Sequence, residues 1–350
     1  MLPCMKTRLP LILAALLLTT GWTIRDLGTL PGGGLSVART INNGGMVAGM
    51  AGNSAGVMRA VWWDAATGAI HEIPTPVVPG RFSTAYGIND KGAIVGRMGT
   101  STSDAHAFKY QFGVLTDLTA PSTSIAFAIS PSNTIAGQWT VAGTPPRSYA
   151  VVWGGGTPGT PYGLGGFGGW VDFANDVTDA PVVAGTAALL TFPPKKHAFL
   201  WIGGSMRDLG TLGGINSTGR GLLVGTWPDP TESSIFVVGE SQIVPGSLET
   251  HAFLYNMGTM QNIGTLPGCT DTTAYAINKS KQVVGTCRGG GISRAWLWNG
   301  ITMVALESLI VPAEADRLGN FQKPVRRRCA EGGADRGLVV VVVDAFCGVE

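Results

Sequence analysis

The sequence predicts an all-β protein, a β-propeller-like array of about six four-stranded repeats, and three observations support this. First, only 13% of the 350 residues are charged, while 52 are glycine and 21 are proline, a composition typical of short strands joined by many turns. Second, hydrophobic residues make up 45% of the chain, enough for a large core, which excludes a disordered protein. Third, a set of short segments recurs along most of the chain.

The first recurring segment begins with a small residue, any residue and Ala, continues through Ile-Asn or a similar pair, and ends in an apolar run closed by Gly. The same eleven positions separate the Ala from the final Gly in five copies: Ala38 to Gly49, Ala85 to Gly96, Ala126 to Gly137, Ala174 to Gly185 and Ala274 to Gly285. Asn and Asp tolerate left-handed backbone, and Gly supplies positive φ. Each copy therefore predicts two strands joined by a turn.

Two further segments follow each hairpin. The second reads RAVWW at Arg59, HAFKY at His106, YAVVW at Tyr149, HAFLW at His197, HAFLY at His251 and RAWLW at Arg294. The third is clearest as RDLGTLGG at Arg207 and QNIGTLPG at Gln261. They predict a third and a fourth strand, hence one propeller blade per repeat, with a degenerate seventh blade as the alternative to six. Alternation places His, Phe and Trp of HAFLW on one face and Ala and Leu on the other, and the small Ala suits close contact between sheets.

These phrases resemble the HAF family of bacterial extracellular repeat proteins. The resemblance rests on HAF(L/W), DLGTLGG and A-x-x-IN-x-x-G-x-VVG and covers roughly residues 24–310. It implies an exported repeat protein. It implies no activity and no catalytic residues.

The chain divides into three parts. Residues 1–21 are expected to be a signal peptide, because Lys6 and Arg8 precede the apolar run from Leu9 to Leu18. That run is too short to span a membrane, so we expect an extracellular or periplasmic protein without a membrane span after signal removal. Residues 22–310 are the repeat domain. The RDLGTLPGG segment at Arg25 precedes the first full repeat and is expected to complete the last blade and close the ring.

Residues 311–350 lack the repeat and contain three consecutive arginines and a five-valine run. One hypothesis is that the reading frame was lost near residue 311. The alternative is a genuine divergent tail whose valine run pairs as a last strand.

The net charge argues against nucleic-acid binding, and the cysteines leave two alternatives open. A net charge of +2 over this length makes no field that would steer the chain to nucleic acid. Cys269 and Cys287 flank one predicted hairpin, and either a disulfide between them or free buried thiols fits the sequence.

The residues that could be catalytic or bind a metal recur at the spacing of the repeat, which indicates structural roles. His106, His197 and His251 occupy one repeat position, which Arg59, Tyr149 and Arg294 fill elsewhere, so no ring of metal ligands is complete and a structural role is expected. Asp26, Asp117 and Asp208 recur at repeat spacing and are expected to cap turns. The Gly-x-Ser-x-Gly match at Gly52 has no helix pattern after it, as a nucleophile elbow would need. No cofactor motif is found, so no cofactor is expected.

Three tryptophans outside the repeated strands, Trp139, Trp170 and Trp227, are candidates for stacking on sugars, although capping of blade edges is the simpler interpretation. The sequence thus favours an exported scaffold for binding or surface interaction, with a polysaccharide or cell-surface component as partner and without catalysis. The alternative is an extracellular glycan-active hydrolase with a site in the propeller channel, marked by carboxylates that converge near the axis. An open, solenoid-like adhesin is a third interpretation, marked by free strand edges.

Overall fold

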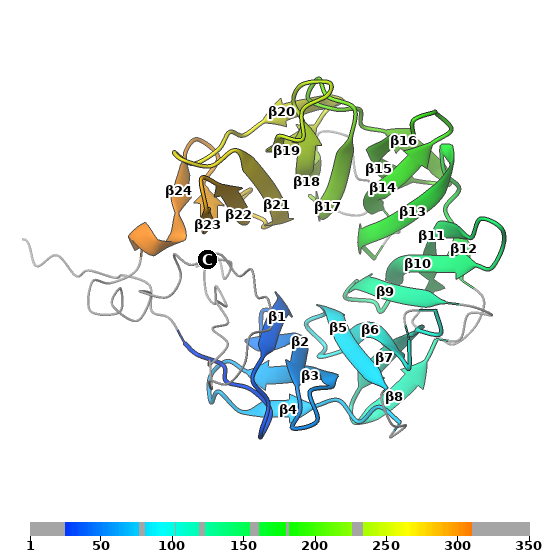
Figure 1. Cartoon of the computed structure of the whole chain (residues 1–350), viewed down its shortest axis with the longest axis vertical. Coiled ribbons are helices and arrows are strands. Elements are labelled where there is room, and N and C mark those ends of the chain that lie inside the picture. Colours follow the sequence, from blue (N-terminus) through cyan, green and yellow to red (C-terminus); the bar gives the residue numbers. More distant parts are fainter. Residues whose placement is uncertain are drawn as a thin grey trace, which may run out of the picture.

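The computed structural model is an all-β propeller (Figure 1). It describes residues 25–76, 81–101, 103–118, 123–154, 161–179, 182–225 and 234–309. These residues form 24 strands and a short 3-10 helix, Leu306–Leu309. Predictions for residues 1–21 and for residues 311–350 lie outside the described residues. No helix in the described ranges is both long enough and apolar enough to cross a membrane.

Within each four-stranded sheet the strands follow chain order from the axis outward (Figure 1). The four-stranded sheets are β1(Ser36–Ile41) to β4(Ile70–Glu72) through β2(Met46–Gly52) and β3(Met58–Asp64); β5(Phe82–Ile88), β6(Ile94–Gly99), β7(His106–Gln111) and β8(Val114–Asp117); β17(Ser217–Val224), β18(Ile235–Gln242), β19(Thr250–Asn256) and β20(Thr259–Asn262); and β21(Asp271–Ile277), β22(Val283–Gly289), β23(Ile292–Trp298) and β24(Met303–Ala305). The remaining strands are β9(Ser124–Ile129), β10(Ile135–Val141), β11(Arg147–Trp153), β12(Tyr162–Gly163), β13(Gly168–Val177), β14(Val183–Leu189), β15(Lys196–Ile202) and β16(Ser205–Asp208).

These remaining strands form one eight-stranded sheet, so four separate four-stranded sheets are found where about six are expected. The junction is a parallel pairing of Ser148 in β11 with Val171 in β13. It has a local cause. β12 is only two residues long and β13 extends to ten residues, so the first half of β13 reaches the edge of β11.

The constant spacing between Ala and Gly in the repeat follows from strand register. Ala174 pairs directly with Gly185 across the β13–β14 hairpin, and a β-bulge follows the Ala. The same pairing and bulge occur in the other four copies. The bulge brings the partner strand so close that a Cβ on Gly185 would lie 2.0 Å from the carbonyl oxygen of Phe173. Only glycine fits at this position.

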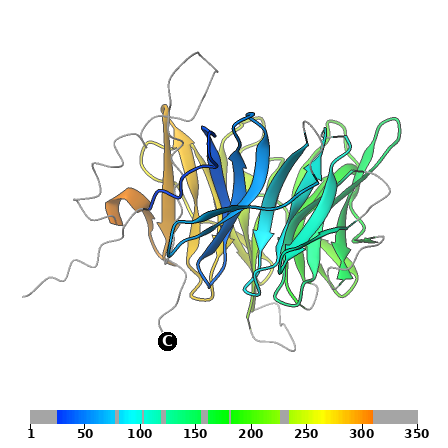
Figure 2. The same ribbon diagram turned by 90° about the horizontal axis from the view of Figure 1, so that it is seen from below.

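The predicted alternation of HAFLW is confirmed in β15. Phe199 and Trp201 pack in a hydrophobic cluster with β11 and β14, while Ala198 and Leu200 pack with Ile235 and other residues of the next sheet. Both faces of the strand are buried because this sheet stands between two neighbouring groups of strands, as the sheets follow one another in Figure 2. The repeated alanine, fully buried in all three HAF segments, allows this close approach.

A buried hydroxyl ties successive sheets together. Ser217, at the start of β17, accepts a hydrogen bond from the backbone N–H of Ala198 in β15, and Ser124 does the same for Ala107. Thr272 accepts from the N–H of Ala252 and donates to the carbonyl of Gly264. In these repeats the small residue that opens the repeat is therefore a link between sheets, and it satisfies backbone groups that the strands leave unpaired.

The expectation that the segment at Arg25 completes the last sheet is wrong. β24, from the far end of the repeat domain, is the fourth strand of that sheet, and residues 25–30 form no strand. Instead, Leu27 and Leu30 pack against Val61 and Trp63 of the first sheet. The segment RDLGTLGG at Arg207 repeats this arrangement. Its Leu209 and Leu212, which match Leu27 and Leu30, pack against the sheet that follows them. The N-terminal segment thus covers a sheet face and adds no strand edge.

Candidate functional site

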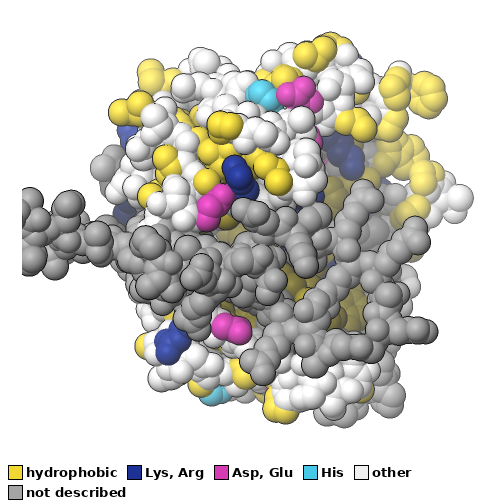
Figure 3. All heavy atoms as spheres, turned by 60° about the vertical axis from the view of Figure 1, so that its left-hand side comes forward, with side chains coloured by type: hydrophobic (Ala, Val, Ile, Leu, Met, Phe, Trp, Pro, Cys, Tyr) yellow, Lys and Arg dark blue, Asp and Glu magenta, His cyan; other side chains and the backbone are white. Residues whose placement is uncertain are grey.

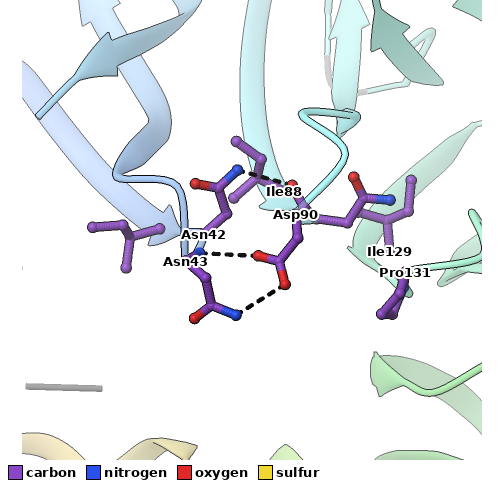
Figure 4. Close-up of a pocket in the computed structure, with 8 residues that line it drawn as sticks. Asn42, Asn43, Ile88, Asp90, Ile129 and Pro131 are labelled. Carbon is purple, nitrogen blue, oxygen red and sulfur yellow. Dashed lines mark hydrogen bonds between the residues drawn. The ribbon is translucent and has the colours of Figure 1, made fainter. Parts of the chain in front are cut away.

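A pocket of about 220 Å³ lies where the innermost strands β1, β5 and β9 end (Figure 4). Its lining combines an apolar part with polar turn residues: Ile41, Asn42, Asn43, Ile88, Asn89, Asp90, Ile129 and Pro131. Pockets for drug-sized ligands usually exceed about 300 Å³. This pocket therefore suits a small ligand or one ring of a longer molecule.

The repeated Asn of the Ile-Asn pair builds the frame of the pocket. Asn42 Oδ1 accepts from the N–H of Met46 and closes its own turn, while Asn42 Nδ2 donates to the carbonyl of Asn89 in the next sheet. Asn89 repeats the arrangement with the N–H of Ala93 and the carbonyl of Ser130. Positive φ occurs three residues after the Asn, at Gly45 and Gly92, so Gly supplies it in these turns as expected.

Asn43 and Asp90 form the polar rim of the pocket. The backbone N–H and the Nδ2 of Asn43 each donate to one carboxylate oxygen of Asp90, both at 2.9 Å. Both side chains are exposed, and Figure 4 shows them facing each other from the turns that follow β1 and β5. Each carboxylate oxygen keeps a further lone pair, so the rim offers acceptors to hydroxyl groups.

Further along the same strands toward their N-terminal ends, the β-bulges place one extra residue in each innermost strand. The residues at this position are Arg39, Tyr86, Phe127, Asn175, Arg220 and Tyr275. They belong to the strands nearest the axis (Figure 1). They share a place in the repeat but differ in type, whereas the residue before them is Ala in five copies and Gly219 in the sixth.

Side chains of the bulge residues contact one another from sheet to sheet. The guanidinium carbon of Arg39 lies 4.9 Å from the ring centroid of Tyr86. The rings of Tyr86 and Phe127 meet edge to face at 5.5 Å, and Phe127 meets Phe173, which stands two residues before the bulge residue of β13, at 6.3 Å. Tyr86 stands two residues before Ile88 of the pocket, about 7 Å along the strand. An aromatic platform thus adjoins the pocket.

On the other side of the ring, the bulge residue Arg220 is paired with a carboxylate of its own sheet. Arg220 Nε and a terminal nitrogen bind the two carboxylate oxygens of Glu240 at 2.6 and 2.7 Å. The guanidinium of Arg220 lies 5.4 Å from the Tyr275 ring centroid, and the Tyr275 hydroxyl contacts Thr286. This arginine has the carboxylate partner that its charge requires.

Two buried carboxyl groups lie on β13. Burial raises the pKa of Asp176 to about 6, against hydrogen bonds from the N–H groups of Leu222 and Val177 that lower it. Burial also raises the pKa of Asp172 to about 6, against the Ala188 N–H and the charge of Arg147. Asp176 spends its oxygens on linking β13 to β17. Asp172 replaces the Ser or Thr that opens the other repeats and accepts a hydrogen bond from the N–H of Ala188 in its own hairpin. Asp176 therefore serves a junction between sheets, and Asp172 serves the β13–β14 hairpin.

The predicted histidines and aspartates pair within their own sheets. His106 Nδ1 lies 3.2 Å from Asp117 Oδ2, and His197 Nδ1 lies 2.8 Å from Asp208 Oδ2. The backbone N–H of Gly210 also donates to Asp208, a turn cap. His251 takes an Asn262 amide in place of the aspartate.

The remaining candidate residues lie apart from these pairs. Asp26 caps its turn through the N–H of Gly28. The Ser of Gly-x-Ser-x-Gly lies in the turn between β2 and β3. Among the described residues, no three His, Cys, Asp or Glu side chains are grouped as a metal site would need. Of the two alternatives for Cys269 and Cys287, the structure has the disulfide.

The three candidate tryptophans do not form a site together. Trp139 packs against a hydrophobic cluster beside Tyr149. Trp170 is 49% exposed at the start of β13, and Trp227 lies outside the described residues. Charged side chains on the face in Figure 3 are scattered rather than gathered in one patch.

The sequence analysis does not identify the bulge residues, because a search for repeats finds only positions at which the same residue recurs. Their signal is a variable residue directly after a repeated Ala.

No protein-family model and no curated protein matches this chain. Several solved structures are similar to it. The β-propeller domain of the Trilobed protease from Pyrococcus furiosus is 10% identical, with a TM-score of 0.48, over 78% of this chain and 84% of that chain. A putative TolB from Agrobacterium tumefaciens is 12% identical, with a TM-score of 0.46, over 68% and 84%. An oligogalacturonate lyase from Vibrio parahaemolyticus is 10% identical, with a TM-score of 0.46, over 82% and 79%. These likenesses concern the fold.

Proposed function

We propose that this chain is an exported, extracellular or periplasmic binding scaffold of the HAF-repeat type, which holds a saccharide at its axis without catalysis. We count the eight-stranded sheet as two repeats, which gives six in all. One observation carries the proposal: a pocket with Ile walls and the Asn43–Asp90 rim adjoins the Tyr86–Phe127 platform on the same strands. Saccharides present hydroxyl groups at their edges and C–H groups on their faces. Acceptors beside apolar and aromatic surface match both.

Binding without catalysis is supported by the partners of the carboxylates near the axis. A glycosidase needs two carboxyl groups about 5 to 9.5 Å apart that are free to act on the substrate. Here Asn43 binds Asp90, Arg220 binds Glu240, and backbone amides bind Asp176. Of these three carboxylates only Asp90 lines the pocket, so the pair that a glycosidase needs is not formed there by these groups.

A saccharide screen on the mature chain, with hydrolysis products monitored, tests the proposal. We expect at least one oligosaccharide to bind, with no product, and Tyr86→Ala to weaken that binding at least tenfold. Tyr162→Ala is the matched control, because Tyr162 is an exposed tyrosine on β12 at the outer side of its sheet. Released product would instead support the alternative, a glycan-active hydrolase in the channel. Equal effects of the two tyrosine variants would contradict an axial site.

A further inference from the structure

Arg39 and Arg220 occupy the same position in two repeats but differ in their partners. Both are bulge residues of an innermost strand, and each guanidinium lies over a tyrosine ring, that of Tyr86 or that of Tyr275. Arg220 also binds the carboxylate of Glu240 through two nitrogens. Arg39 has no carboxylate within ion-pair distance among the described residues, and its side chain is exposed.

The strand register explains the difference. Glu240 directly follows the repeated Gly of its hairpin, Gly239, which pairs with Gly219. In the first sheet the residue that follows the repeated Gly49 is Met50. The sulfur of Met50 contacts the Thr84 hydroxyl of β5, the same strand that Arg39 reaches through Tyr86. The place that holds a carboxylate in the β17–β18 hairpin therefore holds the uncharged thioether of Met50 in the β1–β2 hairpin.

The neighbouring repeat adds a second cation. Arg97 directly follows the repeated Gly96, and its guanidinium carbon lies 6.0 Å from the Tyr86 ring centroid and 5.3 Å from that of Phe82. Its Nε is buried without a hydrogen-bond partner, and no carboxylate of the described residues pairs with it. Two guanidinium groups thus flank one tyrosine, and neither is neutralised by an acidic side chain in the described part of the chain.

We infer that the axial site takes an acidic saccharide, one whose ring carries a carboxylate as in the uronic acids, and that Arg39 binds this carboxylate as Arg220 binds Glu240. This inference rests on the proposed function and gives its ligand a charge. The Arg220–Glu240 pair is the internal template for the geometry: a planar guanidinium and a planar carboxylate joined by two parallel hydrogen bonds. The aromatic platform and the Asn43–Asp90 rim then contact the sugar ring and its hydroxyl groups.

The test is calorimetric titration of the mature chain with trisaccharides of glucuronate, galacturonate and mannuronate. Each is compared with the neutral trisaccharide that has CH₂OH in place of the carboxylate. We expect at least one acidic trisaccharide to bind tenfold or more tightly than its neutral counterpart. Arg39→Gln should remove this preference and leave the melting temperature unchanged, since Arg39 is exposed. Arg288→Gln, at an exposed arginine of β22, is the matched control and should leave the preference intact.

Met50→Glu is the sharpest variant, because it gives the first sheet the carboxylate that Glu240 provides in β18. We expect the new side chain to bind Arg39 and to abolish the preference for the acidic ligand while neutral saccharides still bind. A preference that survives both Arg39→Gln and Met50→Glu would overturn the inference, as would equal binding of acidic and neutral trisaccharides. Tighter binding of a sulfated trisaccharide would overturn the carboxylate assignment. If no saccharide binds at all, the proposed function itself fails.

Discussion

The hydroxyl oxygen of Ser217 accepts a hydrogen bond from the backbone N–H of Ala198, 2.9 Å away in the preceding strand group, and both residues are buried. The bond joins β15 to β17, two strands that belong to different sheets and do not pair with each other. We expect Ser217→Ala to destabilise the protein by about 1 to 3 kcal/mol, because a buried backbone N–H loses its acceptor. Chemical denaturation measures the loss. Ser217→Thr should be nearly neutral, since Thr272 makes the same link; equal losses would contradict this role.

Gly185 has no space for a side chain. A Cβ there would lie 2.0 Å from the carbonyl oxygen of Phe173 and 2.7 Å from the ring of Phe199. We expect Gly185→Ala to lower the free energy of unfolding by about 3 kcal/mol or more, because backbone and core must both shift. Gly34→Ala is the control, because a Cβ at Gly34 would meet no atom within 4 Å, and it should change the free energy by less than about 0.5 kcal/mol. Similar melting temperatures for the two variants would count against the Ala174–Gly185 register.

Ala198 marks the closest approach of β15 to the next sheet. It is fully buried among Leu200, Ile235 and Phe253. Ala198→Leu should overpack this contact and cost about 1 to 3 kcal/mol. Thermal unfolding checks this against Ala55→Leu, a change in an exposed turn. An unaltered melting temperature for Ala198→Leu would contradict the close contact between β15 and the next sheet.

Asp172 gives the stability a pH dependence. Its pKa of about 6 in the folded protein, raised by burial, lies above the ordinary value of 3.8, so the folded state binds the proton more tightly than the unfolded state does. Its contribution is therefore fully favourable below about pH 4 and is lost as the pH rises through 6. Asp172→Asn mimics the protonated form. We expect the variant to gain about 3 kcal/mol over the wild type at pH 7.5 and less than about 1 kcal/mol at pH 4. The comparison needs urea titrations at both pH values, and an identical difference at both would refute the assignment.

The sequence predicts the framework of this protein better than its site. The Ala–Gly spacing, the HAF strands and the turns recur, since every sheet must solve the same packing problem, and recurrence makes them visible. The junction of β11 and β13 is not periodic, because it arises from one shortened strand, β12. The axial residues also escape a repeat search. Arg39 and Phe127 share a position but not a chemistry, and the bulge that directs them inward depends on pairing across the hairpin.

The most direct test of an axial binding site is hydrogen exchange of the backbone amides with and without the saccharide that the screen identifies. An axial site predicts that the ligand slows exchange in the ends of β1, β5 and β9 and their turns, residues 39–43, 86–90 and 127–131. The outer strands β4 and β8 should exchange at unchanged rates. Protection confined to the outer strands, or to the sheet that contains Trp170, would contradict binding at the axis.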